Sequence, residues 1–403
     1  MSYFATTQIQ GANDGTTDAF QRIRTSQATT LFDSQFQYDL QPLVWETVTT
    51  GTATVAHLSA ESAVQMTTTT AGDYGILQSR QYHRYQPGKS QAIFMTFQNM
   101  SAQNVAIKQA GYFDNSNGIF LQSSGGTYYI VRRNSASGSV VDTQIPQASW
   151  NIDRFDGTGP SGVTLDFSKD QILVIDFQWL GVGRVRVGFD VDGRLYYAHQ
   201  FLNANNLTTV YMATPNLPLR YALSANGPAT FKPICSAVVA EAGFEAERGY
   251  SFSASNKITG VTAGATQLYL LTIRPLSSFK GQTPRGQILP MSYDICTNAA
   301  NAVVYFELTK NATFSAPPSY TAVSADSMVE YSVGNGTITV TGGTVVDSGY
   351  VAGSRVSQTA TLPIKVPLSL SYNGLSANTL TLSIINIAGT PPTFGAFSWQ
   401  ELR

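Results

Sequence analysis

The amino-acid sequence predicts an all-β protein with two antiparallel β-sandwich domains, the first jelly-roll or lectin-like, preceded by an extended N-terminal arm. Three observations predict this fold class. Short runs in which apolar and polar residues alternate recur along the chain, and turns rich in Gly, Asn, Asp and Ser separate them. No segment keeps apolar residues at i, i+3 and i+4 over several turns, as a helix would. The length of 403 residues exceeds what one domain usually needs, which favours two.

Composition sets the expected boundaries of these parts. Residues 1–42 form the arm, residues 43–247 the jelly-roll-like sandwich, and residues 248–403 the C-terminal sandwich. The first thirty residues are polar and rich in Gly, Thr and Gln, which is typical of a flexible terminus. Apolar residues that a solvated tail would not need favour instead an arm that becomes ordered against a neighbouring subunit: Phe20, Ile23, Leu31 and Phe32.

The clearest β signal lies between residues 171 and 200. The run QILVIDFQ at 171–178 is apolar and β-branched, and after a glycine-bearing turn the run at 184–189 alternates Arg with Val. A third run at 194–200 follows Asp192-Gly193, and Asp-Gly between two such runs is a strong hairpin signal. This stretch therefore predicts a three-stranded meander.

The other strands of the first sandwich follow from the same alternation. We expect three within 43–70 and others at 75–81, 82–86, 91–99, 110–113, 119–122, 128–133, 209–213, 219–224 and 236–240. More than ten short antiparallel strands avoid exposed edges by folding into two packed sheets. A jelly-roll sandwich is the architecture that this pattern favours.

The second sandwich is expected to begin near Tyr250, after the charged stretch AEAGFEAERGY, which is either a short linker or a single helical turn. Its strands are predicted at 267–274, 285–296, 302–309, 327–331, 338–345, 365–370, 379–387 and 394–402. A sandwich of this size is ordinary for a domain. Its last strand ties the C-terminus of the sequence into a sheet.

Charge and hydropathy exclude several functions. Charged residues make up only 12% of the chain and the net charge is −1, which argues against nucleic-acid binding, because neutralising phosphates takes clustered Lys and Arg. The N-terminus MSYFATTQIQ lacks the pattern of a signal peptide, and no apolar run approaches the ~20 residues of a membrane span. We therefore expect a protein made in a cytoplasm, without membrane insertion.

No enzyme motif is found in the sequence. The three histidines, His57, His83 and His199, sit in strand contexts without a metal-binding spacing, which favours packing roles. No G-x-S-x-G nucleophile turn occurs. Gly181 and Gly183 lack the third glycine and following helix of a phosphate site. We predict a non-enzymatic protein with no catalytic residues, no metal ligands and no cofactor.

Aspartates give the remaining candidates for chemistry. Asp153, Asp156 and Asp166 lie among glycines and Pro160, where turn chemistry competes with a calcium loop, but the regular calcium-loop spacing is missing. Two pairs, Asp153 with Asp156 and Asp190 with Asp192, could serve glycoside hydrolysis only if they flanked a cleft about 5 Å or about 6.5–9.5 Å apart. We interpret all of these as turn acids.

The chain contains two cysteines, Cys235 and Cys296. Two cysteines make neither a disulfide framework nor a structural zinc site. We interpret both as buried thiols, and a single disulfide between them is the alternative.

Three segments resemble a family of virion structural proteins from tailed bacteriophages. They read DGTGPSGVTLDFSK at 156–169, WLGVGRVRVGF at 179–189 and FLNANN at 201–206. The resemblance extends to FQRIRTSQATTLFDSQFQYDLQPLVW at 20–45 and, more loosely, to the C-terminal third. It implies a structural component of a virus particle, tail-, baseplate- or fibre-associated, that assembles in the host cytoplasm and acts through contacts with other phage structural proteins.

The resemblance also implies a homo-oligomer, with a trimer by family analogy alone. A near-neutral surface rich in Thr, Ser, Asn and Gln favours such wide, moderately polar contacts. The alternatives are a capsid decoration protein and a receptor-binding adhesin for host surface glycan. In the adhesin, exposed aromatics would stack on sugar rings: Tyr128, Tyr129, Tyr196 and Tyr197. Because adjacent strand residues point to opposite faces, one tyrosine of each pair should instead pack in the core.

Overall fold

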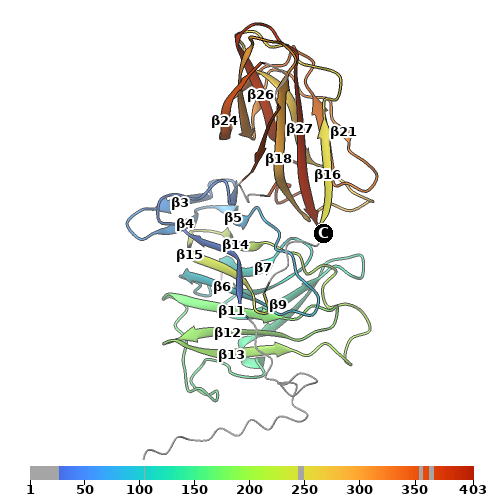
Figure 1. The fold of residues 1–403 in the computed structure, drawn as a ribbon. Helices are drawn as coiled ribbons and strands as arrows, with labels where there is room; N and C mark the ends of the chain where they lie inside the picture. Colours follow the sequence, from blue (N-terminus) through green and yellow to red (C-terminus); the bar gives the residue numbers. More distant parts are fainter. Residues whose placement is uncertain (1–26, 104, 244–248, 354–356, 363–366) are drawn as a thin grey trace, which may run out of the picture.

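The computed structural model describes residues 27–103, 105–243, 249–353, 357–362 and 367–403, and these residues form an all-β protein with two sandwiches (Figure 1). One sheet of the first sandwich holds β1 (Thr29–Gln35), β3 (Thr54–Leu58), β4 (Ala63–Thr68), β6 (Gln91–Gln98), β11 (Gln171–Phe177), β12 (Val185–Val191), β13 (Arg194–Phe201) and β15 (Ala229–Ala240). The other holds β2 (Trp45–Thr50), β5 (Ala71–Ser79), β7 (Ala106–Phe113), β8 (Gly118–Ser124), β9 (Thr127–Asn134), β10 (Val141–Pro146) and β14 (Leu219–Asn226).

The strand order of the first sandwich is that of a jelly roll. The sheets run β13-β12-β11-β6-β15-β4-β3 and β10-β9-β8-β7-β14-β5-β2, and every pairing is antiparallel. Strands β4 to β7 alternate between the two sheets. Later in the chain, β14 inserts between β5 and β7 in one sheet, and β15 inserts between β4 and β6 in the other. The winding of paired strands across two sheets defines this architecture.

Side-chain alternation explains how the first core forms. In β6, Ile93, Met95 and Phe97 are fully buried between the sheets, whereas Phe94 faces outward and is 37% exposed. The predicted meander at 171–200 is confirmed as β11, β12 and β13. Its second turn has φ of 53° at Asp192 and 75° at Gly193, and two positive φ values suit a tight hairpin.

Two strands expected in the first sandwich are absent, and one strand that it contains was not predicted. Residues 82–86 make only one isolated bridge, from His83 to Leu217, and residues 209–213 form no strand. Both runs pack against the core as loops: Tyr82, His83 and Tyr85 are buried in the first, and Tyr211 and Met212 in the second. Strand β10 was not predicted, because its exposed, polar sequence lacks a clear alternation.

The N-terminal segment joins the sandwich earlier than the expected boundary at residue 42. Strand β1 pairs antiparallel with β15, and Phe32 and Phe36 are buried in the core. The alternation within 31–36 therefore makes a strand of the sheet rather than part of an arm. Phe20 and Ile23, with the rest of the predicted arm up to residue 26, lie outside the described residues.

The second sandwich packs a sheet of β16 (Tyr250–Ser255), β27 (Thr393–Leu402), β18 (Gln287–Thr297) and β25 (Ser357–Thr361) against a larger one. The larger sheet holds β21 (Thr321–Ala322), β22 (Val329–Val333), β17 (Leu268–Pro275), β26 (Leu380–Ala388), β19 (Val303–Lys310) and β24 (Thr344–Ala352), and β20 (Thr313–Phe314) pairs with β23 (Val340–Thr341) beside it. The strand predicted at 338–345 is divided between β23 and β24, because Gly342 and Gly343 both take positive φ.

Two further expectations are only partly covered by the described residues. The linker or helical turn before Tyr250 falls mostly on residues 244–248, and the strand predicted at 365–370 begins in 363–366; both segments lie outside the description. Elsewhere in the described chain the only helix is the short 3-10 turn Gln147–Ser149, so no helix there is long enough to cross a membrane. Strand β27 ends beside the first sandwich, which places the last residues next to its loops (Figure 1).

Candidate functional site

The two sandwiches meet through a small set of polar and aromatic contacts. Glu46 Oε2 accepts a hydrogen bond from the backbone N–H of Tyr372 at 2.7 Å, and the hydroxyls of Tyr74 and Tyr372 lie 3.3 Å apart. The side-chain amide of Gln287 donates to the backbone oxygen of Tyr82 at 3.0 Å. These bonds join β2, β5 and the loop after β5 of the first sandwich to a loop and a strand of the second.

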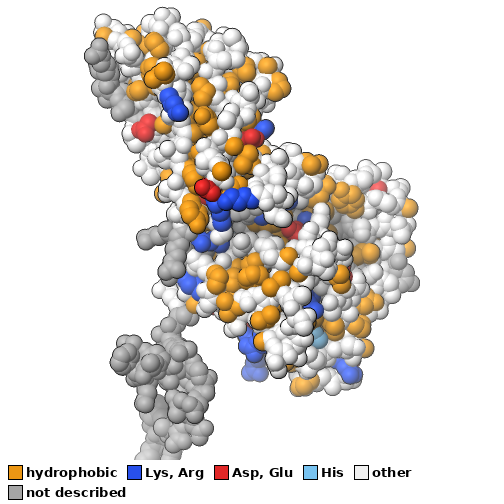
Figure 2. Space-filling model, turned by 90° about the vertical axis from the view of Figure 1, so that its right-hand side faces the viewer, with side chains coloured by type: hydrophobic (Ala, Val, Ile, Leu, Met, Phe, Trp, Pro, Cys, Tyr) orange, Lys and Arg blue, Asp and Glu red, His pale blue; other side chains and the backbone are white. Residues whose placement is uncertain are grey.

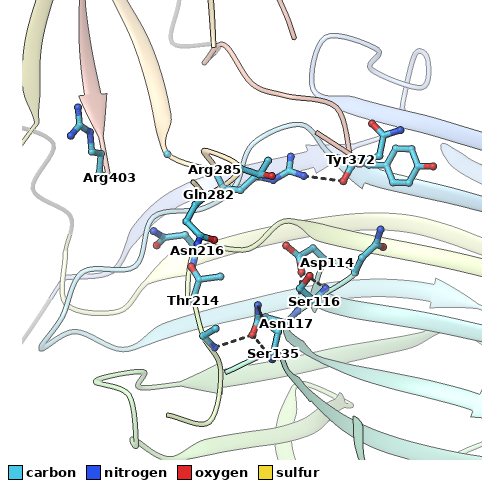
Figure 3. A pocket seen from close by; sticks show the side chains of 15 residues that line it. Asp114, Ser116, Asn117, Ser135, Thr214, Asn216, Gln282, Arg285, Tyr372 and Arg403 are labelled. Carbon is cyan, nitrogen blue, oxygen red and sulfur yellow. Dashed lines mark hydrogen bonds between the residues drawn. The ribbon is translucent and has the colours of Figure 1, made fainter. Parts of the chain in front are cut away.

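A cleft opens beside this seam, with a volume of about 660 Å³. Figure 2 shows a hollow between the two sandwiches, with Lys and Arg side chains (blue) beside it. The lining residues are Asp114, Asn115, Ser116, Asn117, Ser135, Ala213, Thr214 and Asn216 from the first sandwich, and Gln282, Thr283, Arg285, Gly286, Tyr372, Asn373 and Arg403 from the second (Figure 3). Its size is within the range of small-molecule sites, and domain junctions are common places for them.

The wall from the first sandwich is built on the turn between β7 and β8. Asp114 Oδ1 accepts the backbone N–H groups of Ser116 and Asn117 at 2.7 and 2.8 Å, which closes the turn. Asn117 is buried, and its Oδ1 accepts from the backbone of Ser135 at 3.2 Å and of Ala213 at 2.9 Å (Figure 3). Asn117 thus fixes three loops around the cleft and has no oxygen left for a ligand.

Three other asparagines of the lining use their side-chain oxygens inside the protein. Asn115 Oδ1 accepts from Arg220 Nη1 at 2.6 Å, and Asn216 Oδ1 accepts the backbone N–H of Tyr85 at 2.9 Å. Asn373 Oδ1 accepts the backbone N–H of Leu375 at 3.0 Å. Because each oxygen faces a donor, the orientation of each amide is set by the network, and its NH₂ group is the free end.

Three arginines lie in this region, and one of them, Arg403, is paired with the Glu401 carboxylate at 2.8 Å. Arg220 is buried behind Asn115, stacks on Phe113 at 5.2 Å, and donates through Nε to Gln78 Oε1 at 2.8 Å. Burial lowers the pKa of its guanidinium below the usual value. Arg285 donates to the backbone oxygens of Ser371 and Tyr372, at 2.8 and 3.0 Å.

Arg285 also lies 4.5 Å from the centre of the Tyr82 ring, and burial raises the pKa of Tyr82 to about 12. In the described part of the chain, no carboxylate forms an ion pair with Arg220 or Arg285. Asp114 is the one acidic side chain in the lining.

The aspartates considered from sequence are turn acids and lie away from the cleft. Asp153 is buried, and its carboxylate accepts the backbone N–H groups of Phe155 at 2.9 Å and Ser161 at 2.7 Å. Hydrogen bonds from Thr158 lower the pKa of Asp156, and hydrogen bonds from Ser168 lower that of Asp166. Asp190 accepts the backbone N–H of Gly193 at 3.1 Å, within the hairpin that also contains Asp192.

The described residues contain no group of three or more His, Cys, Asp or Glu side chains placed to hold a metal ion. The histidines occupy packing positions. His83 is fully buried with its ring 5.0 Å from that of Phe32, and burial lowers its pKa to about 3. His199 Nδ1 accepts the backbone N–H of Asn151 at 3.2 Å, and burial lowers its pKa to about 4. His57 Nε2 lies 2.7 Å from the backbone oxygen of Phe36.

The tyrosines proposed as sugar platforms also lie outside the cleft. Tyr128 packs on Phe167 at 4.0 Å, and Tyr196 packs against the core, so one member of each pair faces inward as expected. Tyr129 contacts a small apolar cluster on the outer face of the β7–β9 sheet. The Tyr197 hydroxyl donates to the Asp176 carboxylate, and this contact and burial raise the pKa of Tyr197.

Both cysteines are free thiols, as interpreted from the sequence, but they are half-buried rather than buried. Cys235 donates to Thr96 Oγ1 at 3.3 Å on the outer face of the larger sheet. Burial and the nearby Asp294 carboxylate raise the pKa of Cys296.

That outer face carries a second notable surface. Phe94 in β6, Ile172 in β11 and Leu195 in β13 are 37%, 39% and 42% exposed. Ile172 and Leu195 both pair with Asp190 of β12, which places them in one row, and Phe94 lies in the neighbouring row. We call these three residues the outer patch, because they give one sheet face an apolar surface in contact with solvent.

No protein-family model matches this chain, and no curated protein sequence matches it either. Solved structures match in fold. An endo-1,3-β-glucanase from Streptomyces sioyaensis is 9% identical and covers 55% of this chain and 99% of its own, with a TM-score of 0.38. A legume lectin-like domain from Entamoeba histolytica is 10% identical and covers 51% of this chain and 95% of its own, with a TM-score of 0.30. These are distant likenesses, and no activity follows from them.

Proposed function

We propose that this protein is a non-enzymatic structural component of a tailed-bacteriophage virion, tail-, baseplate- or fibre-associated, that acts through protein–protein contacts. The observation that carries the proposal is the outer patch. Phe94, Ile172 and Leu195 project from one sheet face, with Asp190 between Ile172 and Leu195, and no described element covers them. Several exposed apolar side chains on one sheet face are more typical of a contact surface than of a free monomer.

The low charge of the chain supports the same function. Only 12% of the residues are charged, so a contact formed by the outer patch would depend on apolar burial and neutral polar groups rather than on ion pairs. Such a contact is little affected by salt. The use of the candidate aspartates within their own turns also supports a structural role over glycoside hydrolysis.

A charge placed in the outer patch tests the proposal. Ile172→Glu should leave the fold intact, because the side chain is already exposed, but should prevent self-association in sedimentation and incorporation into particles. Ile258→Glu is the matched control, since Ile258 is 94% exposed in the second sandwich. If the two variants assemble equally well, the outer patch is no contact surface and the proposal loses its main support.

Two other functions remain as outcomes of a localisation experiment. Antibody labelling of particles would place the protein on the tail, as proposed, or on the head surface, as expected of a capsid decoration protein. Labelling of only the tail tip, combined with adsorption blocked by the antibody, would favour a receptor-binding adhesin.

A further inference from the structure

We propose that the cleft between the two sandwiches is a binding site for an acidic oligosaccharide, one that carries carboxylates as well as hydroxyls. This function goes beyond assembly and uses different residues from the outer patch. Three features of the cleft carry it: its free hydrogen-bonding groups, its unbalanced charge and its extent.

The free groups of the cleft are mainly donors. The oxygens of Asn115, Asn216 and Asn373 are occupied by Arg220, Tyr85 and Leu375, whereas no partner among the described residues binds their NH₂ groups. Three amide NH₂ groups from three separate loops therefore line one cleft of about 660 Å³. A complementary ligand must be rich in acceptors, as carboxylates and sugar oxygens are.

The charge of the cleft selects an anionic ligand. Arg220 and Arg285 are held by neutral oxygens of the protein, and neither forms an ion pair with a described carboxylate. Asp114 supplies the single acidic group of the lining, and its Oδ1 is used by the turn that it closes. The arginines of the lining are Arg285 and Arg403, and Arg220 lies buried behind Asn115. Arg403 is paired with buried Glu401, so three arginines stand against the carboxylates of Asp114 and Glu401. One positive charge is left in excess beside a partly enclosed space, where it attracts anions.

The extent of the cleft favours an oligosaccharide over a small anion. Its donors come from the loops at 115 and 216 of the first sandwich and from the loop at 373 of the second, so they do not converge on one point. The Tyr372 ring lines the same space (Figure 3) and offers a flat surface against which a sugar ring can pack. A chain of two or three acidic sugars reaches several of these groups at once.

Trigalacturonic acid is the test ligand, and its fully methyl-esterified form, which has the same rings without the charge, is the comparison. Titration calorimetry on the full-length chain should give saturable binding of the acid with Kd on the order of 1 mM or tighter. The ester should bind at least about tenfold more weakly, because it lacks the negative charge that the excess positive charge of the cleft attracts. Absence of saturable binding, or equal binding of acid and ester, would overturn the proposal.

Isosteric variants show whether binding takes place in the cleft. Asn216→Asp keeps the oxygen that accepts from Tyr85 but replaces the free NH₂ with a negatively charged oxygen, so binding should weaken at least about tenfold without loss of stability. Asp114→Asn keeps the acceptor for Ser116 and removes the one acidic charge, so binding should tighten. Asn335→Asp, in an exposed turn elsewhere, is the control. If the first two variants bind like the control, the ligand binds elsewhere and the assignment is wrong.

Discussion

Each sandwich buries a tryptophan whose indole N–H needs a partner, and the two find it in different ways. In the first sandwich, Trp45 Nε1 donates to the hydroxyl of Ser34 at 2.7 Å. In the second, Trp399 Nε1 donates to the carboxylate of Glu401 at 3.2 Å. A neutral hydroxyl costs little to bury, whereas a carboxylate has to be surrounded by donors. The first core is therefore closed by aromatic packing and the second by a polar network.

The surroundings of the two tryptophans bear this out. The Trp45 ring lies 5.8 Å from Phe32 and 5.6 Å from Phe36, both supplied by the β1 segment. Glu401 is fully buried and accepts from Ser327 Oγ at 2.6 Å and from the backbone of Met328 at 2.9 Å. Stability of the first sandwich thus depends on a segment from the start of the described chain, and that of the second on a single side chain near its last residue.

Of the changes predicted here, removal of β1 should reduce the stability of the first sandwich the most. Deletion of residues 1–36 removes Phe32, Phe36 and the hydrogen-bond partner of Trp45, and each buried ring alone contributes about 3–5 kcal/mol. We expect the first sandwich to unfold, seen as rapid hydrogen exchange of its amides by mass spectrometry, while the second stays protected. Deletion of residues 1–26 is the control, and should leave exchange in both sandwiches as in the full chain. Equal protection in the two truncated chains would mean that β1 is dispensable.

The substitution Trp45→Ala should have the next largest effect. It empties a fully packed site between the sheets and leaves Ser34 without its partner, so the free energy of unfolding of the first sandwich should fall by about 3–5 kcal/mol. Urea denaturation followed by exchange measurements would assign the loss to the first sandwich. Trp45→Phe keeps most of the packing and should lose less than Trp45→Ala.

Glu401→Ala should reduce the stability of the second sandwich by about 3 kcal/mol or more, because three buried donors lose their acceptor. These donors are Ser327, the backbone of Met328 and Trp399. Glu401→Gln keeps one oxygen in place and should lose clearly less in the same urea titration. If the two variants are equally stable, the network does not hold the second core together.

The sequence predicts the strands of both cores better than their edges and connections. The sequence predicts the meander at 171–200 because its first run is apolar and β-branched, its second run alternates Arg with Val, and Asp192-Gly193 marks a turn. The alternation at Leu31 and Phe32 was visible too, but it does not say whether a short strand pairs within its own sheet or with a neighbouring molecule. The segments 82–86 and 209–213 are loops rather than the predicted strands, because side chains of a loop that packs on the core are buried as those of a strand are.

The cleft, by contrast, leaves no signal in the sequence. Asn115, Asn216 and Asn373 look like ordinary turn residues, and only the meeting of two domains brings them together with Arg285. What makes them candidates is the direction in which each amide is fixed by a neighbour, as Asn216 is by the backbone of Tyr85. Such a tertiary property cannot be derived from spacing along the chain.

Mild acid should destabilise the first sandwich more than the second, because all three histidines lie in the first. Burial lowers the folded pKa to about 3 for His83 and to about 4 for His199, both below the unfolded value of about 6.5. As pH falls from 6.5 towards 4, the unfolded chain takes up protons that the folded chain does not, so each histidine costs up to about 1.4 kcal/mol of stability per pH unit.

The prediction for acid is therefore a fall in the stability of the first sandwich between pH 6.5 and 4.5, with little change in the second. His199→Gln should make that fall less steep by about half, since one of the two buried histidines is gone. Urea midpoints at several pH values would measure it, with domain-resolved exchange as the readout. An equal loss in both sandwiches would point to groups other than histidine.

Trp179→Ala should have the smallest effect of the set. Trp179 is only partly buried at the turn after β11, donates through Nε1 to the backbone oxygen of Met212 at 3.0 Å, and lies edge-on to Tyr85. We expect about 1–2 kcal/mol in urea denaturation, below the loss for Trp45→Ala. A loss as large as that of Trp45→Ala would mean that the turn is as tightly packed as the space between the sheets.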